Sequence, residues 1–232
     1  MIVAPCPGRT IAASSSMGPS PGGRKKPDIA APGYRLYTTS HLGGFEQKTG
    51  TSYSAPAIAG AAALLIQSGV SDARAVKAIM LNSADDYGAP GWDGDFGWGY
   101  FNGDTTFARR QQYFVSTLGD ATSNTRVRFF EHATASPVKA TLVWNRDATY
   151  AGATAPTSSF STALAARLCA TTDGVLLDYS LSSKDNVEQV ATSLAEPTVV
   201  VLKAASSFTG LETFALAHSG GFVARTGPGV QG

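Results

Sequence analysis

The stretch Gly50–Pro56 reads Gly-Thr-Ser-Tyr-Ser-Ala-Pro, and its residue types could present a nucleophile. Proline is tolerated in the first turn of a helix, because its missing N–H has no partner to lose there. We therefore expect a helix to begin near Ser52. The free N–H groups and the positive dipole end of such a helix can stabilise a developing oxyanion. Ser52 is thus a candidate nucleophile for acyl transfer. The alternative is an ordinary helix N-cap, for which serine and threonine are common choices.

The residues that follow predict the elements that would hold this serine. Ala57–Ile66 are small or apolar on every side, a pattern typical of a buried helix. A second helix is expected to begin at Ser71, with the serine as its cap. Its apolar residues would share one face while its basic residues point away, which is ordinary amphipathic packing and needs no function. That face holds Ala73, Val76, Ile79 and Met80.

Two segments upstream make the nucleophile interpretation more specific. Residues 14–19 read Ser-Ser-Ser-Met-Gly-Pro, and residues 26–33 read Lys-Pro-Asp-Ile-Ala-Ala-Pro-Gly. With Gly50–Pro56, they resemble in type and order the motifs of the subtilisin-like serine protease (subtilase) family. That family has S-S-x-G-P, then K-P-D-[IV]-x-A-P-G, then G-T-S-x-x-x-P and an alanine-rich helix. By this resemblance Ser52 matches the nucleophilic serine, and Asp28 is structural rather than catalytic.

The resemblance also implies a histidine base and a carboxylate that orients it, in the chain order Asp, His, Ser. Both belong to segments upstream of the first motif, where this sequence has little. Its histidines are His41, His132 and His218, and none stands in the family's histidine motif. We therefore expect the C-terminal portion of a subtilisin-like serine endopeptidase, inactive as this chain alone and completed by the missing N-terminal part of the catalytic domain. The alternatives are a split enzyme or a non-catalytic relic whose sandwich binds protein or carbohydrate.

Short strands and loops are expected before and after the nucleophile. Thr10–Ser14, Asp28–Ala31 and Tyr34–Thr39 are predicted strands, and His41–Lys48 is a predicted loop. Gly97–Asn102 resembles the element that closes the subtilase catalytic domain.

The pattern changes after about residue 112, where alternating segments are separated by turn residues. Many short strands with little helix indicate an antiparallel β-sandwich. Parts of this region resemble the jelly-roll domain that follows the catalytic domain in some subtilases. The expected fold class is α/β, an incomplete subtilisin-like parallel-sheet domain over residues 1–115, followed by an all-β jelly-roll-like sandwich over residues 116–232. The clearest predicted strands are Val138–Trp144, Val175–Leu181, Pro197–Lys203 and Thr213–Ala217.

The acidic residues raise the question of calcium without a clear motif for it. Asp93-Gly94-Asp95 does not fit an EF-hand loop. The family's N-D-L-D-L segment is replaced here by Ser161–Leu168, which carries no acid. We expect no cofactor and no metal. The acids concerned are Asp85, Asp86, Asp93, Asp95 and Asp104.

Composition narrows the partners. Acidic and basic residues nearly balance at a net charge of +1, which favours neither a nucleic-acid partner nor an anionic membrane surface. No apolar run is long enough to cross a bilayer. The expected partner is a peptide or protein substrate, and the full-length protein is expected to be secreted or extracellular, although Met1–Pro7 does not read as a signal peptide. Cys6 and Cys169 either pair or serve as small apolar residues.

Overall fold

The computed structural model describes most of the chain as two compact units, each described below by itself. One unit comprises Met1–Ser71 and Ser83–Arg110, and the other comprises Asp72–Asn82 and Gln111–Gly232. The residues described are 10–119, 126–145, 164–170, 175–182, 184–204 and 210–225.

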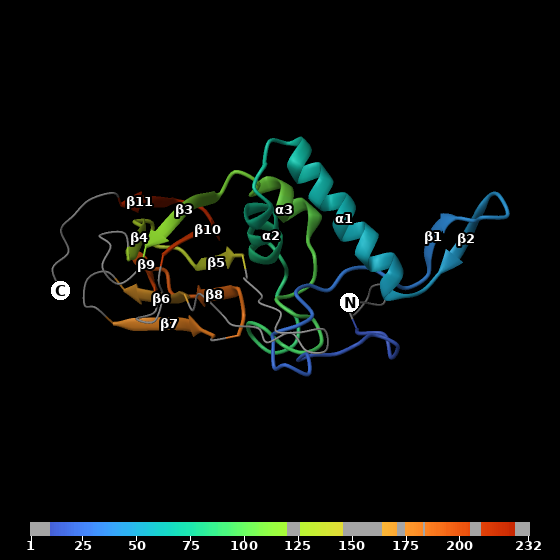
Figure 1. Ribbon diagram of the computed structural model, residues 1–232, viewed down its shortest axis with the longest axis horizontal. Coiled ribbons are helices and arrows are strands. Elements are labelled where there is room, and N and C mark those ends of the chain that lie inside the picture. The colour runs from blue at the N-terminus through green and yellow to red at the C-terminus, as the bar shows by residue number, and fades with distance from the viewer. Residues whose placement is uncertain are drawn as a thin grey trace. The chain divides into compact units, whose positions relative to one another are not determined.

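The first unit contains a hairpin and two helices (Figure 1). Strand β1 (Leu36–Thr39) pairs antiparallel with β2 (Phe45–Lys48), and helices α1 (Thr51–Gln67) and α3 (Gly103–Ala108) follow. The loop predicted over His41–Lys48 is therefore wrong for its second half. Residues 45–48 alternate exposed and half-buried side chains, and two glycines with positive φ close the turn before them.

Single bridges replace the two earliest predicted strands. Ile29 bridges to Gly97 and Ala30 to Tyr100, the latter in parallel orientation, while the described part of the Thr10–Ser14 segment forms no strand. Within the described residues of this unit, the hairpin is the only sheet, so the expected parallel sheet is not formed there. This unit does contain both helices and strands.

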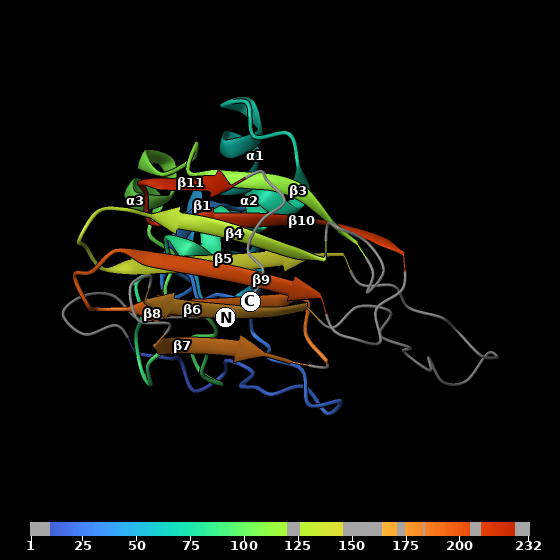
Figure 2. The same cartoon turned by 90° about the vertical axis from the view of Figure 1, so that its left-hand side faces the viewer.

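The second unit is built from two antiparallel sheets, as the period-two pattern predicts. The first has the order β3-β10-β5-β8 and the second the order β11-β4-β9-β6-β7, which Figure 2 shows from top to bottom. Whether the connections are those of a jelly roll stays a prediction. The strands are β3 (Tyr113–Gly119), β4 (Val127–His132), β5 (Val138–Trp144), β6 (Leu164–Ala170), β7 (Leu176–Leu181), β8 (Val187–Thr192), β9 (Thr198–Ala204), β10 (Leu211–His218) and β11 (Phe222–Arg225).

Large apolar side chains from both sheets form one core between them. Trp144 and Phe214 come from the first sheet and Phe130 from the second, and all three are almost fully buried. Such burial of aromatic and branched side chains is the main favourable term in folding.

Edge strand β7 departs from the predicted pattern. The apolar face expected over Val175–Leu181 is largely exposed, with Tyr179 at 63% and Leu181 at 60%. Its buried residue is Ser180 instead. The Ser180 hydroxyl accepts from the N–H of Gln189 at 3.4 Å, and the Asp178 carboxylate accepts from the N–H of Ala191 at 2.8 Å. Polar side chains of β7 thus cover the open hydrogen-bonding edge of β8.

Helix α2 (Ala73–Asn82) belongs to the second unit and packs on β10, β5 and β3. The Asp72 carboxylate caps its first turn by accepting from the N–H groups of Arg74 and Ala75 at 2.8 and 3.2 Å. The predicted cap, Ser71, is therefore wrong by one residue. The helix is also buried beyond the single predicted face, and Ala73 is exposed. The additional buried residues are Ala75, Ala78, Leu81 and Asn82.

A buried chain of hydrogen bonds fastens α2 to the sheet beneath it. The Thr141 hydroxyl donates to Asn82 Oδ1 at 3.0 Å and accepts from Gln189 Nε2 at 2.8 Å. Thr141 is fully buried, so neither partner finds water in its place if the hydroxyl is removed.

We predict that Thr141→Val destabilises the second unit by about 1–3 kcal/mol, because it leaves two buried amide groups without a partner. Urea denaturation followed by tryptophan fluorescence measures the change. Thr117→Val is the matched control, because Thr117 is an exposed residue of β3 whose hydroxyl can be replaced by water. Equal stability of the two variants would contradict the role of the hydroxyl.

Candidate active site

The turn before α1 needs glycine at position 50. Gly50 has φ 156° and ψ 157°, a backbone conformation that is essentially restricted to glycine. Its N–H donates to the carbonyl of Gly33 at 2.8 Å, and its carbonyl accepts from the N–H of Tyr53 at 3.0 Å. The first bond ties the segment 26–33 to the start of α1, a contact that sequence reasoning missed because it joins residues far apart in the chain.

The first two motifs also touch each other. A Cβ on Gly18 would clash with the carbonyl of Lys26, so only glycine lets these backbones approach so closely. The N–H of Gly18 donates to the carbonyl of Gly94 at 2.8 Å, and Trp92 Nε1 donates to the carbonyl of Pro27 at 3.1 Å. The three motifs that suggested a nucleophile therefore lie in one continuous set of backbone contacts.

Asp28 forms an ion pair with Lys26 at the surface of this set. That Asp28 is structural rather than catalytic, as the resemblance implies, stays a prediction.

Gly97–Asn102 lies between two other segments of the unit. The N–H of Trp98 donates to the carbonyl of Asp28 at 2.9 Å, and Tyr100 and Asp85 exchange two backbone bonds of 2.7 and 2.9 Å. Gly97 and Gly99 have φ of 69° and 123°, so glycine is needed at both turns. This element joins the segment 26–33 to Asp85 within the same unit.

Ser52 is the second residue of α1 and is exposed. The residue at the N-cap is Gly50, and no side chain caps the helix. The alternative that Ser52 is an ordinary cap is therefore wrong. The first N–H groups of a helix have no intrahelical acceptor, so Ser52 combines an exposed hydroxyl with unsatisfied donors and the positive end of the helix dipole.

Pro56 lies in the second turn of α1 rather than the first, because the helix begins at Thr51. An N–H at position 56 would donate to the carbonyl of Ser52, and proline has none. The carbonyl of Ser52 is thus left without its helical partner. Ser52 thus differs from an average helical residue in two ways. Gly50 precedes it in a glycine-only conformation, and Pro56 removes the donor for its carbonyl.

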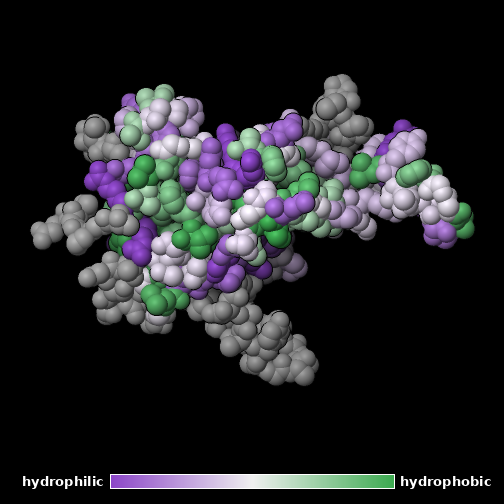
Figure 3. Space-filling model, turned by 90° about the horizontal axis from the view of Figure 1, so that it is seen from above, coloured by the Kyte–Doolittle hydropathy of each residue, from purple (hydrophilic) through white to green (hydrophobic). Residues whose placement is uncertain are grey.

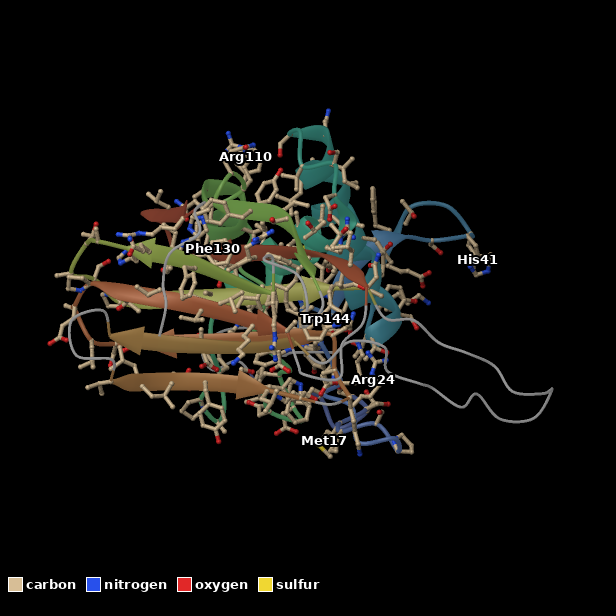
Figure 4. The ribbon with its side chains drawn as sticks, turned by 60° about the vertical axis from the view of Figure 1, so that its left-hand side comes forward. Met17, Arg24, His41, Arg110, Phe130 and Trp144 are labelled. Atoms are coloured by element: carbon tan, nitrogen blue, oxygen red, sulfur yellow. The ribbon has the colours of Figure 1, made fainter. Side chains whose placement is uncertain are left out.

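The candidate histidines do not assemble with Ser52 among the described contacts. His41 is exposed in the connection between β1 and β2, and Figure 4 shows it at the outer end of the hairpin. His132 and His218 lie on β4 and β10 of the other unit, where only 3% and 6% of their surface is exposed. No hydrogen bond between a described histidine and the Ser52 hydroxyl occurs.

Three of the five aspartates considered for calcium accept local hydrogen bonds. Asp93 Oδ1 accepts from the N–H groups of Asp95 and Phe96 at 2.8 and 2.7 Å, and Asp86 accepts from the N–H of Gly91 at 2.9 Å. Asp85 accepts from Asn102 Nδ2 at 2.9 Å. Within the described part of the chain, no three His, Cys, Asp or Glu side chains converge on a common point.

Helix α1 is exposed, whereas its composition predicts burial. Its buried residues are Ser54 and Leu65, while Leu64 is 59% and Ile66 57% exposed. The reason is the absence of an opposing apolar layer among the described residues of this unit. A groove of about 430 Å³ runs between α1 and α3, lined by Gly60, Leu64, Phe101, Thr106 and Phe107 among others.

The hairpin adds further exposed apolar surface. Tyr37 is 75%, Leu42 84% and Phe45 77% exposed. Figure 3 shows green apolar surface at the end of this hairpin, on the right of the view. Among the described residues, no helix has both the length and the hydropathy needed to span a bilayer.

Comparison with profiles of protein families supports the resemblance seen in the motifs. The profile of the subtilase family matches residues 3–99. Among solved structures, the chain is similar to fervidolysin from Fervidobacterium pennivorans, described as a keratinolytic enzyme related to subtilisin, with 17% sequence identity and a TM-score of 0.31. That similarity covers 70% of this chain and 22% of fervidolysin, so the chain spans about a fifth of that protein's length. No curated protein matches the chain.

We predict opposite effects for two Gly→Ala substitutions around Ser52. Gly50→Ala forces alanine into a glycine-only conformation and is expected to cost about 1–3 kcal/mol. Gly60→Ala is expected to add about 0.5–1 kcal/mol, because Gly60 lies inside α1 and a Cβ there meets no atom within 4 Å. Thermal melts by differential scanning fluorimetry compare both with the unmodified chain. The same sign for both would contradict the geometry assigned to Gly50.

Proposed function

Residues 3–99 are a subtilase-like segment, and from this we propose that the chain is the C-terminal portion of a subtilisin-like serine endopeptidase with Ser52 as its nucleophile. The observation that carries the proposal is the bond from the Gly50 N–H to the Gly33 carbonyl. It joins two motifs that are separate in the sequence and fixes the turn that presents an exposed Ser52 at the start of α1.

The proposed reaction is acyl transfer from a peptide bond. The Ser52 hydroxyl attacks the scissile carbonyl carbon, its proton passes to a histidine, and the leaving amine takes that proton as the acyl-enzyme forms. Water then hydrolyses the ester. The unsatisfied N–H groups at the start of α1 stabilise the oxyanion. The histidine and the carboxylate that orients it come from residues outside this sequence, so the chain alone does not cleave peptides.

The proposed partner is the N-terminal part of the catalytic domain, in the same or a separate chain. Exposed α1 supports this partner, because its 17 residues include no charged side chain. Burying apolar surface is favourable by about 25 cal/mol per Å², so Leu64, Ile66 and the groove beside α3 favour a covering layer. The full-length protein is proposed to be secreted, with a peptide or protein substrate and no required cofactor.

We predict that Ser52→Ala, in an enzyme completed with the upstream part, lowers kcat by several orders of magnitude, because the nucleophile is lost. Hydrolysis of a peptide substrate and labelling by a fluorophosphonate probe measure this. Ser71→Ala is the matched control, because Ser71 is exposed and caps no helix here. Labelling of a residue other than Ser52 would overturn the assignment, and inactivity of the completed enzyme would favour the non-catalytic relic.

We predict that Leu64→Glu weakens association with a separately expressed upstream part by at least about tenfold, since a carboxylate in an apolar interface loses its hydration. Isothermal titration calorimetry measures the Kd. Leu211→Glu places the same charge on β10 of the other unit, where Leu211 is 73% exposed, and is expected to leave the Kd unchanged. Equal affinities of the two variants would show that α1 is not covered by this partner.

A further inference from the structure

A second group of ionisable side chains lies inside the sandwich, in the other unit from Ser52. His132 of β4 and His218 of β10 come from different sheets, and both pack against Phe222 of β11, with ring centroids 4.9 and 5.1 Å away. His218 also stacks on Phe114 of β3 at 5.0 Å. The two imidazoles therefore replace part of the apolar packing between the sheets.

The turn that joins the two sheets is held by these rings. The N–H of Gly220 donates to Nδ1 of His218 at 3.2 Å, so this nitrogen carries no proton and the imidazole is neutral. A Cβ on Gly221 would lie 3.1 Å from Nε2 of His132, which shows how closely that ring packs on the turn backbone. Gly220 and Gly221 have φ of 116° and 71°, so both positions favour glycine.

No described counter-charge faces the pair. On β4 and β11, Glu131 and Arg225 form an ion pair with each other, and alternation places Glu131 on the face opposite to His132. On β5, Lys139 precedes Ala140, the residue opposite His218 in the ladder, and so lies on the other face. On β3, Tyr113 precedes Phe114, the residue that stacks on His218, and therefore lies on the opposite face of the sheet. The described polar neighbour of His132 is the Ser136 hydroxyl, 3.4 Å from Nε2.

We propose that His132, His218 and the turn 219–221 form an acid-sensitive latch that holds strand β11 against β4 at neutral pH. When His218 gains a proton at Nδ1, the acceptor for the Gly220 N–H becomes a donor and the turn loses its bond. The charge also appears between two apolar sheets without a carboxylate beside it, which disfavours the closed arrangement. Among the described strands, β11 lies at an edge and pairs only with β4, so it is the element that separates.

The pH range follows from the direction of the shift. Burial, and next the charge of His132, lowers the pKa of His218 from 6.5 to about 4. Because the pKa in the folded state lies below that in the unfolded state, the stabilisation is complete above pH 6.5. It is lost progressively as the pH falls towards 4. A shift of this size corresponds to a rise of roughly two to three orders of magnitude in the opening equilibrium constant.

Amide hydrogen exchange of the complete chain between pH 7 and pH 4.5 tests the latch, with rates corrected for the intrinsic pH dependence of exchange. We expect the amides of β11 to lose protection at least tenfold more than those of β5 as the pH falls. His218→Asn keeps an acceptor at the position of Nδ1 but does not titrate, so its β11 protection is expected to be independent of pH. His41→Asn, which alters an exposed histidine, is the control and is expected to behave as the unmodified chain.

Equal changes in β11 and β5, or an unaltered pH dependence in His218→Asn, would overturn the proposal. If that variant does not fold, ring NMR signals of His218 in the unmodified chain decide the question. The imidazole must then titrate over the same pH range in which β11 loses protection. A His218 titration separated from that loss by more than one pH unit would also overturn it.

Discussion

An apolar helix needs an apolar layer against it, and the candidate site depends on this constraint. α1 has no charged side chain, and its Leu64 and Ile66 are exposed. Burying these side chains against another apolar surface would lower the free energy of the folded state. The start of the same helix carries Ser52, the proposed nucleophile, so the exposed apolar surface and the exposed hydroxyl belong to one helix. Gly50 makes both possible, because its glycine-only backbone conformation leads the chain into the helix without a capping side chain. The first N–H groups of the helix and the Ser52 hydroxyl therefore stay accessible to solvent.

The sequence predicts the sandwich strands best where both faces of a strand meet packed neighbours. Val138–Trp144 was predicted residue for residue, since its alternation reflects a core on one side and α2 on the other. The apolar alternation predicted the wrong buried face for β7, because the buried side chains of this edge strand are those that bond to the neighbouring strand β8. Asp178 and Ser180 there supply acceptors for free N–H groups of β8, and that need depends on a neighbour distant in sequence. Periodicity reports burial but does not reveal which backbone edge lacks a partner.

For the candidate site, local motifs located Ser52 and the helix behind it, and the family profile over residues 3–99 agrees with them. The geometry that makes the serine unusual was not predictable in the same way. The Gly50–Gly33 bond is a contact between segments that are separate in the sequence. The helix starts at Thr51, one residue before the expected start, so Pro56 is its sixth residue and lies beyond the first turn. Helix boundaries are set by such tertiary contacts more than by propensity.

The two units satisfy their surfaces to different degrees, and this difference bears on how function is divided between them. In the second unit, α2 covers the outer face of β5 and β10. Hydrogen bonds from Asn82 through Thr141 to Gln189 join the helix to the sheet, and polar side chains of β7 cover the edge of β8. The described elements of this unit therefore bury one another's surfaces. The described part of the first unit leaves α1 and the hairpin tip open. A folded unit persists only when its buried contacts outweigh the entropy of ordering it. The described sandwich has such contacts on both faces of its sheets, whereas the described segment with Ser52 leaves apolar side chains of α1 exposed, as the proposed N-terminal partner requires.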